Sequence, residues 1–265
     1  MKVISFGVIV GSSGREGVAH YLERLKELGE TPDLVIANAN HAAGGAGLTG
    51  EKADELFEAG VDVLTMGENV WDQKDLQTAI LKRPKILRPE NLPEDTPGGG
   101  VLIYEVGEKN LKVGIINISG YSFMTRIIPD NIFPKIHGLV KKVVDETDIV
   151  IVDFYAKTTA EKRAMGTHLD GMVSLLSGSG TLVQTADEKV SNLGTAYITD
   201  VGMVGASNAV LGFNKEREIW KFQTAMKAFS SPAKGAPLLN GVHVEIDEGS
   251  GQATSIVRIN EVLDI

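Results

Sequence analysis

Side chains that could bind a metal or move a proton stand where short apolar runs end in loops. His41 follows the run that begins at Leu34, and Glu68 and Asn69 follow the run Val63–Met66. Histidine and glutamate are common metal ligands. The chain has 0 Cys and only 5 His, so any metal would depend on His, Asp, Glu or Asn. His41 and Glu68 could hold one metal together, but two ligands are fewer than a typical site uses.

The glycine-rich segment Gly11–Gly14 is a second candidate, because backbone N–H groups at a helix N-terminus favour anions. It lacks the Gly-Lys-Ser/Thr ending of a phosphate-binding loop and does not match Gly-x-Gly-x-x-Gly. A tight turn between a strand and a helix is therefore the favoured interpretation.

Alternating strand and helix patterns must position these loops. The apolar periodicity predicts helices around 18–25, 53–57, 76–81, 134–146 and 159–165, and strands at 3–10, 34–37, 63–66, 101–104, 112–117, 149–154, 172–176 and 196–199. Segments 241–246 and 254–259 flank a turn and predict a hairpin, whereas 84–100 reads as a connecting loop. Such βα units favour an α/β fold with helices outside a sheet. The length of 265 residues favours a single domain, 1–265.

Composition excludes several classes of function. The formal net charge is -9 and no segment concentrates Lys and Arg, which argues against binding of duplex nucleic acid. No apolar run approaches the roughly 20 residues that a membrane span needs. The N-terminus begins directly in a strand-like run without a signal-peptide pattern, so we expect a cytoplasmic protein.

Six segments together resemble one enzyme family. They are Phe6–Gly11, Asn38–Gly45, Met66–Asp72, Asp153–Lys157, Gly178–Asp187 and Thr199–Met203. The order and the sequences of these segments resemble those of the bacterial calcineurin-like metallophosphoesterases that hydrolyse 2′,3′-cyclic nucleotides. The resemblance extends over essentially the whole chain. The resemblance implies a sandwich of two β-sheets flanked by helices. It also implies a pair of divalent metal ions that clamp the phosphodiester and generate the attacking hydroxide.

Carried over position by position, the resemblance implies a vestigial site. The family's ligand and catalytic positions correspond to nine residues here: Val8, Asn40, His41, Glu68, Asn69, Tyr155, Lys157, Gly180 and Leu182. Val, Leu and Gly side chains offer no lone pair, and a lysine brings positive charge where a dication would sit. Other positions in the same segments still match the family: Gly67, Trp71, Asp72, Gln184 and Asp187. The substitutions are therefore concentrated at the metal-ligand and catalytic positions.

The expected function follows from these substitutions. We expect no metal cofactor and no catalysis, hence a scaffold or binding protein for an unknown small molecule or protein, either a pseudoenzyme branch or a redesigned variant. Homo-oligomers are a further expectation, because such relatives can form them. The alternative is a metal-dependent phosphodiesterase acting on 2′,3′-cyclic nucleotides with an unusual ligand set.

The remaining polar residues have simpler roles. We expect Glu68 and Lys157 to form an ion pair across the old site, because the loops that carry them converge in the family fold. Asp170 and Asp200 are expected to fix loops through backbone hydrogen bonds, and Trp71 to pack in the core. The other histidines are expected to be surface or structural residues.

Overall fold

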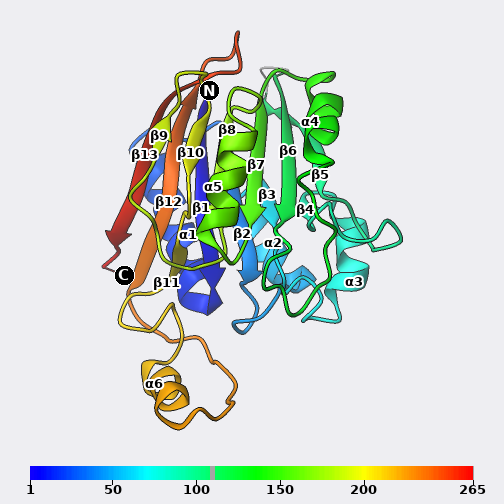
Figure 1. Ribbon diagram of the computed structural model, residues 1–265. Coiled ribbons are helices and arrows are strands. Elements are labelled where there is room, and N and C mark those ends of the chain that lie inside the picture. The colour runs from blue at the N-terminus through cyan, green and yellow to red at the C-terminus, as the bar shows by residue number, and fades with distance from the viewer. Residues whose placement is uncertain (108–110, 265) are drawn as a thin grey trace.

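The computed structural model describes residues 1–107 and 111–264, and two β-sheets face each other with helices on their outer faces (Figure 1). This arrangement confirms the α/β sandwich. The helices are α1 (Gly11–Glu27), α2 (Gly50–Glu58), α3 (Leu76–Ala79), α4 (Ile136–Val144), α5 (Thr159–His168) and α6 (Lys215–Thr224), with a short 3-10 turn η1 (Ile80–Lys82).

The first sheet has seven strands in the order β13-β12-β11-β1-β2-β3-β4. Its strands are β1 (Lys2–Val10), β2 (Leu34–His41), β3 (Val63–Thr65), β4 (Ile86–Leu87), β11 (Met203–Ala206), β12 (Pro237–Ile246) and β13 (Ala253–Val262). β1, β2, β3 and β4 run parallel, and β12 and β13 form the antiparallel hairpin that the sequence predicts.

The second sheet has six strands in the order β5-β6-β7-β8-β10-β9. Its strands are β5 (Val101–Val106), β6 (Leu111–Ser119), β7 (Val150–Tyr155), β8 (Leu175–Ser179), β9 (Lys189–Val190) and β10 (Ala196–Ile198). β6, β7 and β8 are parallel, so their carboxyl ends meet at one edge. Loops that follow β7 and β8 therefore lie close together.

Three apolar layers hold the sandwich together. The middle layer joins the two sheets, with Val3, Ile36 and Val244 from one sheet against Ile115 and Ile151 from the other. The first sheet packs its outer face against α1 and α2, and the second against α4 and α5. Strands buried on both faces read as continuous apolar runs, as β1 and β7 do. The shared middle layer supports the proposal of a single domain.

The Gly11 turn is tight, as expected. Helix α1 begins at Gly11 directly after β1, and Gly11 has φ +62. A Cβ atom on Gly11 would lie 2.4 Å from Cβ of Pro232. Glycine is needed here for the left-handed backbone and for the close approach of the segment around Pro232.

Several predicted elements were misplaced. The expected loop 84–100 contains β4, a two-residue strand too short to show a period. The strand expected at 172–176 is β8, Leu175–Ser179, because Leu169 to Met172 form a turn. β9, β11 and α6 were missed.

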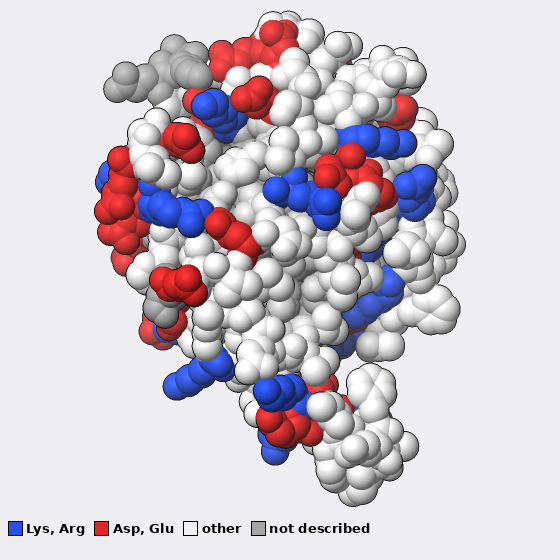
Figure 2. Space-filling model, turned by 90° about the vertical axis from the view of Figure 1, so that its left-hand side faces the viewer, with Lys and Arg blue, Asp and Glu red and all other residues white. Residues whose placement is uncertain are grey.

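The surface carries mixed charge. Figure 2 shows Lys and Arg interspersed with Asp and Glu on the face that it presents, without a basic patch there. Among residues 1–107 and 111–264, no helix has the length and apolar character required to cross a membrane.

Candidate functional site

A cavity of about 460 Å³ lies between the strand-end loops and the α6 segment. Seven of the nine predicted site positions line it: His41, Glu68, Asn69, Tyr155, Lys157, Gly180 and Leu182. The structure thus brings together residues from four separate loops. Asn40 and Val8 do not line this cavity; both are fully buried. A larger groove of about 900 Å³, between the C-terminal ends of α1 and α2, contains none of the predicted residues.

Asn40 joins two loops through its side chain. Its Oδ1 accepts hydrogen bonds from the backbone N–H groups of Gly67 and Asn69, each at 2.9 Å. Its backbone N–H donates in turn to Oδ1 of Asn38 at 3.1 Å. The Asn40 amide therefore fixes the β3 loop against the end of β2.

His41 is held as a neutral ring. Its Nδ1 lies 2.7 Å from the carbonyl oxygen of Gly45, so Nδ1 carries the proton and donates. Burial lowers the pKa of His41, and the nearby positive charge of Lys157 lowers it further. Nε2 is then the acceptor of the ring, and the amide nitrogen of Asn69 lies beside both ring nitrogens, 3.2 Å from Nδ1 and 3.4 Å from Nε2. The ring also packs edge-on against Phe213, with centroids 5.6 Å apart.

Glu68 and Lys157 form the expected ion pair, between Oε1 and Nζ. The Glu68 side chain is 8% exposed and that of Lys157 is 30% exposed, so the pair lies at the cavity wall. Lys157 Nζ also lies 3.5 Å from the Tyr155 hydroxyl. Burial raises the pKa of Tyr155 well above its ordinary value, and the negative charge of Glu68 raises it further.

Apolar side chains surround the other end of the site. Val8, Leu182, Met203 and Phe213 form one buried cluster. Leu182 adopts φ +66, which is uncommon for a residue with a branched side chain. The Leu182 side chain belongs to the same buried cluster as Val8 and Val10 of β1.

Sequence reasoning missed three further groups. Arg126 lines the cavity and pairs with Asp72 at 2.6 Å. Asp153 is buried between the sheets, where it accepts hydrogen bonds from Thr65, Asn38 and Ser179. Burial raises the pKa of Asp153, against the effect of those three donors. No sequence motif links residues so far apart along the chain.

Lys162 and Asp200 form the third group, an ion pair with both side chains 0% exposed. Asp200 also accepts from the backbone of Thr181 at 2.9 Å and of Gly202 at 2.8 Å, which confirms its loop-fixing role. Asp170 differs: its Oδ1 is buried without a partner among the described residues. The prediction for Asp170 is wrong, whereas Trp71 packs against the core as expected.

The side chains present do not fit a metal pair. Within residues 1–107 and 111–264, no three His, Cys, Asp or Glu side chains are grouped so that they could hold an ion. Lys157 places an ammonium group on Glu68, and the amide of Asn40 is committed to backbone donors.

Comparison with known proteins identifies the family. A family model described as "YmdB-like protein" matches residues 4–259. The chain belongs to this family. A 2′,3′-cyclic-nucleotide 2′-phosphodiesterase of Bacillus subtilis is 38% identical over 259 residues, covering 98% of this chain and 96% of that protein. The resemblance inferred from the loop motifs is thus confirmed for this YmdB-like protein.

Solved structures agree with the YmdB-like assignment. A crystal structure described as a novel phosphatase of Mycoplasma pneumoniae has a TM-score of 0.91 at 34% identity, covering 99% of this chain and 93% of that chain. A hypothetical protein from Thermus thermophilus has a TM-score of 0.89 at 30% identity, with 99% of each chain covered. A 5′-nucleotidase of Candida albicans, 11% identical with a TM-score of 0.54 over 85% of this chain and 53% of that chain, shares the fold alone.

Proposed function

We propose that this YmdB-like protein is a non-catalytic binding protein whose metal site is vestigial. The observation that carries the proposal is the Glu68–Lys157 ion pair on the wall of the strand-end cavity. A lysine ammonium and a divalent cation compete for the same carboxylate, and the ion pair already neutralises Glu68. The apolar side chains of Val8 and Leu182 supply no ligand atom in its place.

A second candidate is a phosphodiesterase with an unusual ligand set. His41 and Glu68 line one cavity, and a relative with 38% identity is named as a 2′,3′-cyclic-nucleotide 2′-phosphodiesterase. Two ligand side chains leave most of the coordination of one ion to water, and they leave no ligand for a second ion. Without a metal ion, no activated water is available to attack the phosphodiester. Asn69 stands where the family has a histidine, and a neutral amide cannot donate a proton to the leaving group as an imidazolium would.

Metal analysis and turnover distinguish the two candidates. Purified protein is dialysed, analysed for Mn, Fe and Zn, and assayed with 2′,3′-cyclic AMP with and without added Mn²⁺, beside a Glu68→Gln variant. We expect substoichiometric metal and no turnover that depends on Glu68. Two tightly held equivalents per chain, with turnover abolished by Glu68→Gln, would establish the enzyme instead.

A further inference from the structure

The groove of about 900 Å³ between the C-terminal ends of α1 and α2, here the α1–α2 groove, is separate from the strand-end cavity. Its floor is apolar and accessible, with Ala19, Pro32 and Ala59 all partly exposed. The described residues that line it include five carboxylates and a single lysine, Lys26. The groove therefore suits an occupant that is partly apolar and carries positive charge.

Three of these carboxylates are free to meet a partner. Glu23 and Glu27 lie one turn apart on α1, and Glu58 is the last residue of α2. All three residues are exposed, and none makes an ion pair or a hydrogen bond with another described residue. Like charges one helical turn apart repel, so a cationic partner would stabilise this rim.

Hydrogen bonds hold the groove in shape before anything binds. The Tyr104 hydroxyl on β5 donates to Oδ1 of Asp62 at 2.6 Å, and Oδ2 of Asp62 accepts from the backbone N–H of Val35 at 2.9 Å. These bonds join the second sheet to the first beside the groove. A partner therefore does not have to order the groove in order to bind it.

Helix α6 and the loop after it, residues 214–234, form a lobe of the opposite character. The helix buries none of its residues, and Phe222 and Phe229 are 86% and 67% exposed. Residues 214–234 carry five Lys or Arg and two Glu, in a chain whose formal net charge is -9. Lys227 and Lys234 are exposed and have no ion-pair partner among the described residues. The lobe thus combines the apolar surface and the positive charge that the groove suits.

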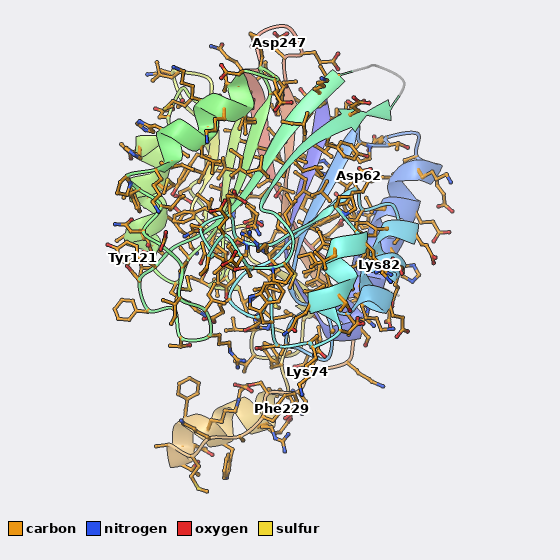
Figure 3. The ribbon with its side chains drawn as sticks, turned by 90° about the vertical axis from the view of Figure 1, so that its right-hand side faces the viewer. Asp62, Lys74, Lys82, Tyr121, Phe229 and Asp247 are labelled. Carbon is orange, nitrogen blue, oxygen red and sulfur yellow. The ribbon has the colours of Figure 1, made fainter. Side chains whose placement is uncertain are left out.

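The lobe cannot reach the groove of its own chain. Figure 3 labels Phe229 on the lobe and Asp62 beside the groove, and the body of the sandwich lies between them. A lobe can therefore enter a groove only on another copy. Such a contact joins two different surfaces of identical chains, so it can continue from copy to copy.

We propose that the α6 lobe of one copy docks in the α1–α2 groove of a second copy. The exposed aromatic rings of the lobe cover the apolar floor, and its lysines neutralise the free carboxylates of the rim. The contact goes beyond the proposed binding function and involves neither Glu68 nor Lys157. Metal content and turnover can therefore come out either way without deciding it.

Two variants of the full chain, each lacking one surface, test the contact by sedimentation velocity. The lobe variant combines Phe222→Ser with Phe229→Ser, and the groove variant combines Glu23→Lys with Glu27→Lys, which keeps good helix formers on α1. We expect each variant alone to be monomeric at concentrations where the wild type assembles. An equimolar mixture should form a 1:1 dimer, because each pair retains one intact lobe and one intact groove.

A contact between two lobes would give a different pattern. The groove variant would then assemble like the wild type, and mixing would add nothing. That pattern, a monomeric wild type, or a mixture of folded variants that stays monomeric would overturn the proposal. Circular dichroism of each variant establishes that it is folded.

Two further variants control for charge and for damage to α1. Asp145→Lys with Glu146→Lys, at exposed positions after α4, reverses the same number of charges outside the groove and should assemble like the wild type. Glu58→Lys alters the rim without touching α1, and we expect it to weaken assembly about tenfold. Assembly by Glu58→Lys at wild-type strength would also reject the proposal.

Discussion

Asn40 and Asn69 show how neutral amides hold the loops of this site. The Asn40 amide oxygen accepts from two backbone N–H groups, and the Asn69 amide nitrogen donates to the carbonyl oxygen of Asn40 beside the neutral imidazole of His41. Each buried amide is useful only because its neighbours fix which end points where. Hydrogen bonds from these amides therefore connect the loops that follow β2 and β3.

The Glu68–Lys157 pair should couple energetically. Lys157→Ala leaves a carboxylate that is 8% exposed without its cation, and we expect it to lower the free energy of unfolding by about 2 kcal/mol, between exposed and buried pairs. Lys157→Ala combined with Glu68→Gln should cost less than Lys157→Ala alone. Urea denaturation of the four proteins of this cycle measures the coupling, with Lys189→Ala as an exposed control. Strictly additive effects would rule the coupling out.

His41 predicts a pH dependence of stability. Burial lowers its pKa below the ordinary value of 6.5, so the unfolded chain binds the proton first as pH falls. The stability that the neutral ring contributes is present above pH 6.5 and is lost below it, by up to about 1.4 kcal/mol per pH unit.

Subtracting a His41→Gln variant isolates this effect, because His243 also has a pKa lowered by burial and contributes in the same direction. Unfolding free energies of both proteins are compared between pH 5 and 7.5. Parallel curves would show that His41 does not carry the dependence.

At the scale of single elements, a buried ion pair fixes helix α5 to a neighbouring loop. Lys162, on α5, meets Asp200 in the loop after β10, with both side chains fully buried. Burial lowers the pKa of Lys162, and Asp200 opposes that shift. The pair joins α5 to the loop after β10, and Asp200 also accepts a hydrogen bond from Thr181 in the loop after β8.

Removing the buried cation should be costly. Lys162→Met leaves the Asp200 carboxylate without a counter-charge, and we expect a loss of about 3–5 kcal/mol in the free energy of unfolding. The exposed Lys141→Met on α4 changes the same side chain without that penalty and should be nearly neutral. Urea midpoints for the two variants provide the comparison, and equal midpoints would contradict it.

Long, periodic elements could be predicted from the sequence, and short or exposed ones could not. β1 and β7 are visible as continuous apolar runs because both of their faces are buried. β4 has two residues and cannot show a period, and α6 buries none of its residues, so it lacks a core-facing stripe. At the site, the motifs predicted which loops meet and that Glu68 meets Lys157. The buried roles of Asp153 and Lys162 could not be predicted, because their partners come together only when the two sheets and α5 pack.

At the scale of the whole molecule, α6 and its flanking loops form a lobe that projects from the sandwich (Figures 1 and 3). Phe222 and Phe229 are 86% and 67% exposed there, and Trp220 and Met226 are also exposed. A short helix that buries no residue gains little from packing. Exposed apolar patches of this kind mark contact surfaces.

The lobe predicts self-association. We expect the protein to sediment as an oligomer, and Phe222→Ser combined with Phe229→Ser to shift it toward the monomer, because the apolar contact area is lost. Leu28→Ser, at a 64% exposed position after α1, is the control and should leave the distribution unchanged. Sedimentation velocity of the three proteins is the measurement, and a monomeric wild type at micromolar concentration would refute the expectation.

The close fit of Gly67 against Tyr155 bears on the evolutionary history of the site. A Cβ atom on Gly67 would lie 2.3 Å from the Tyr155 ring, and the adjoining loop is held by Asn40. If the nine positions are former ligand positions, as proposed, reverting Tyr155 or Asn40 alone would disturb the contacts that each now makes with the Gly67 loop. A smaller ring at 155 leaves a void, and a carboxylate at 40 repels Glu68. On this proposal, the ancestral metal site would return only if several of these positions reverted together.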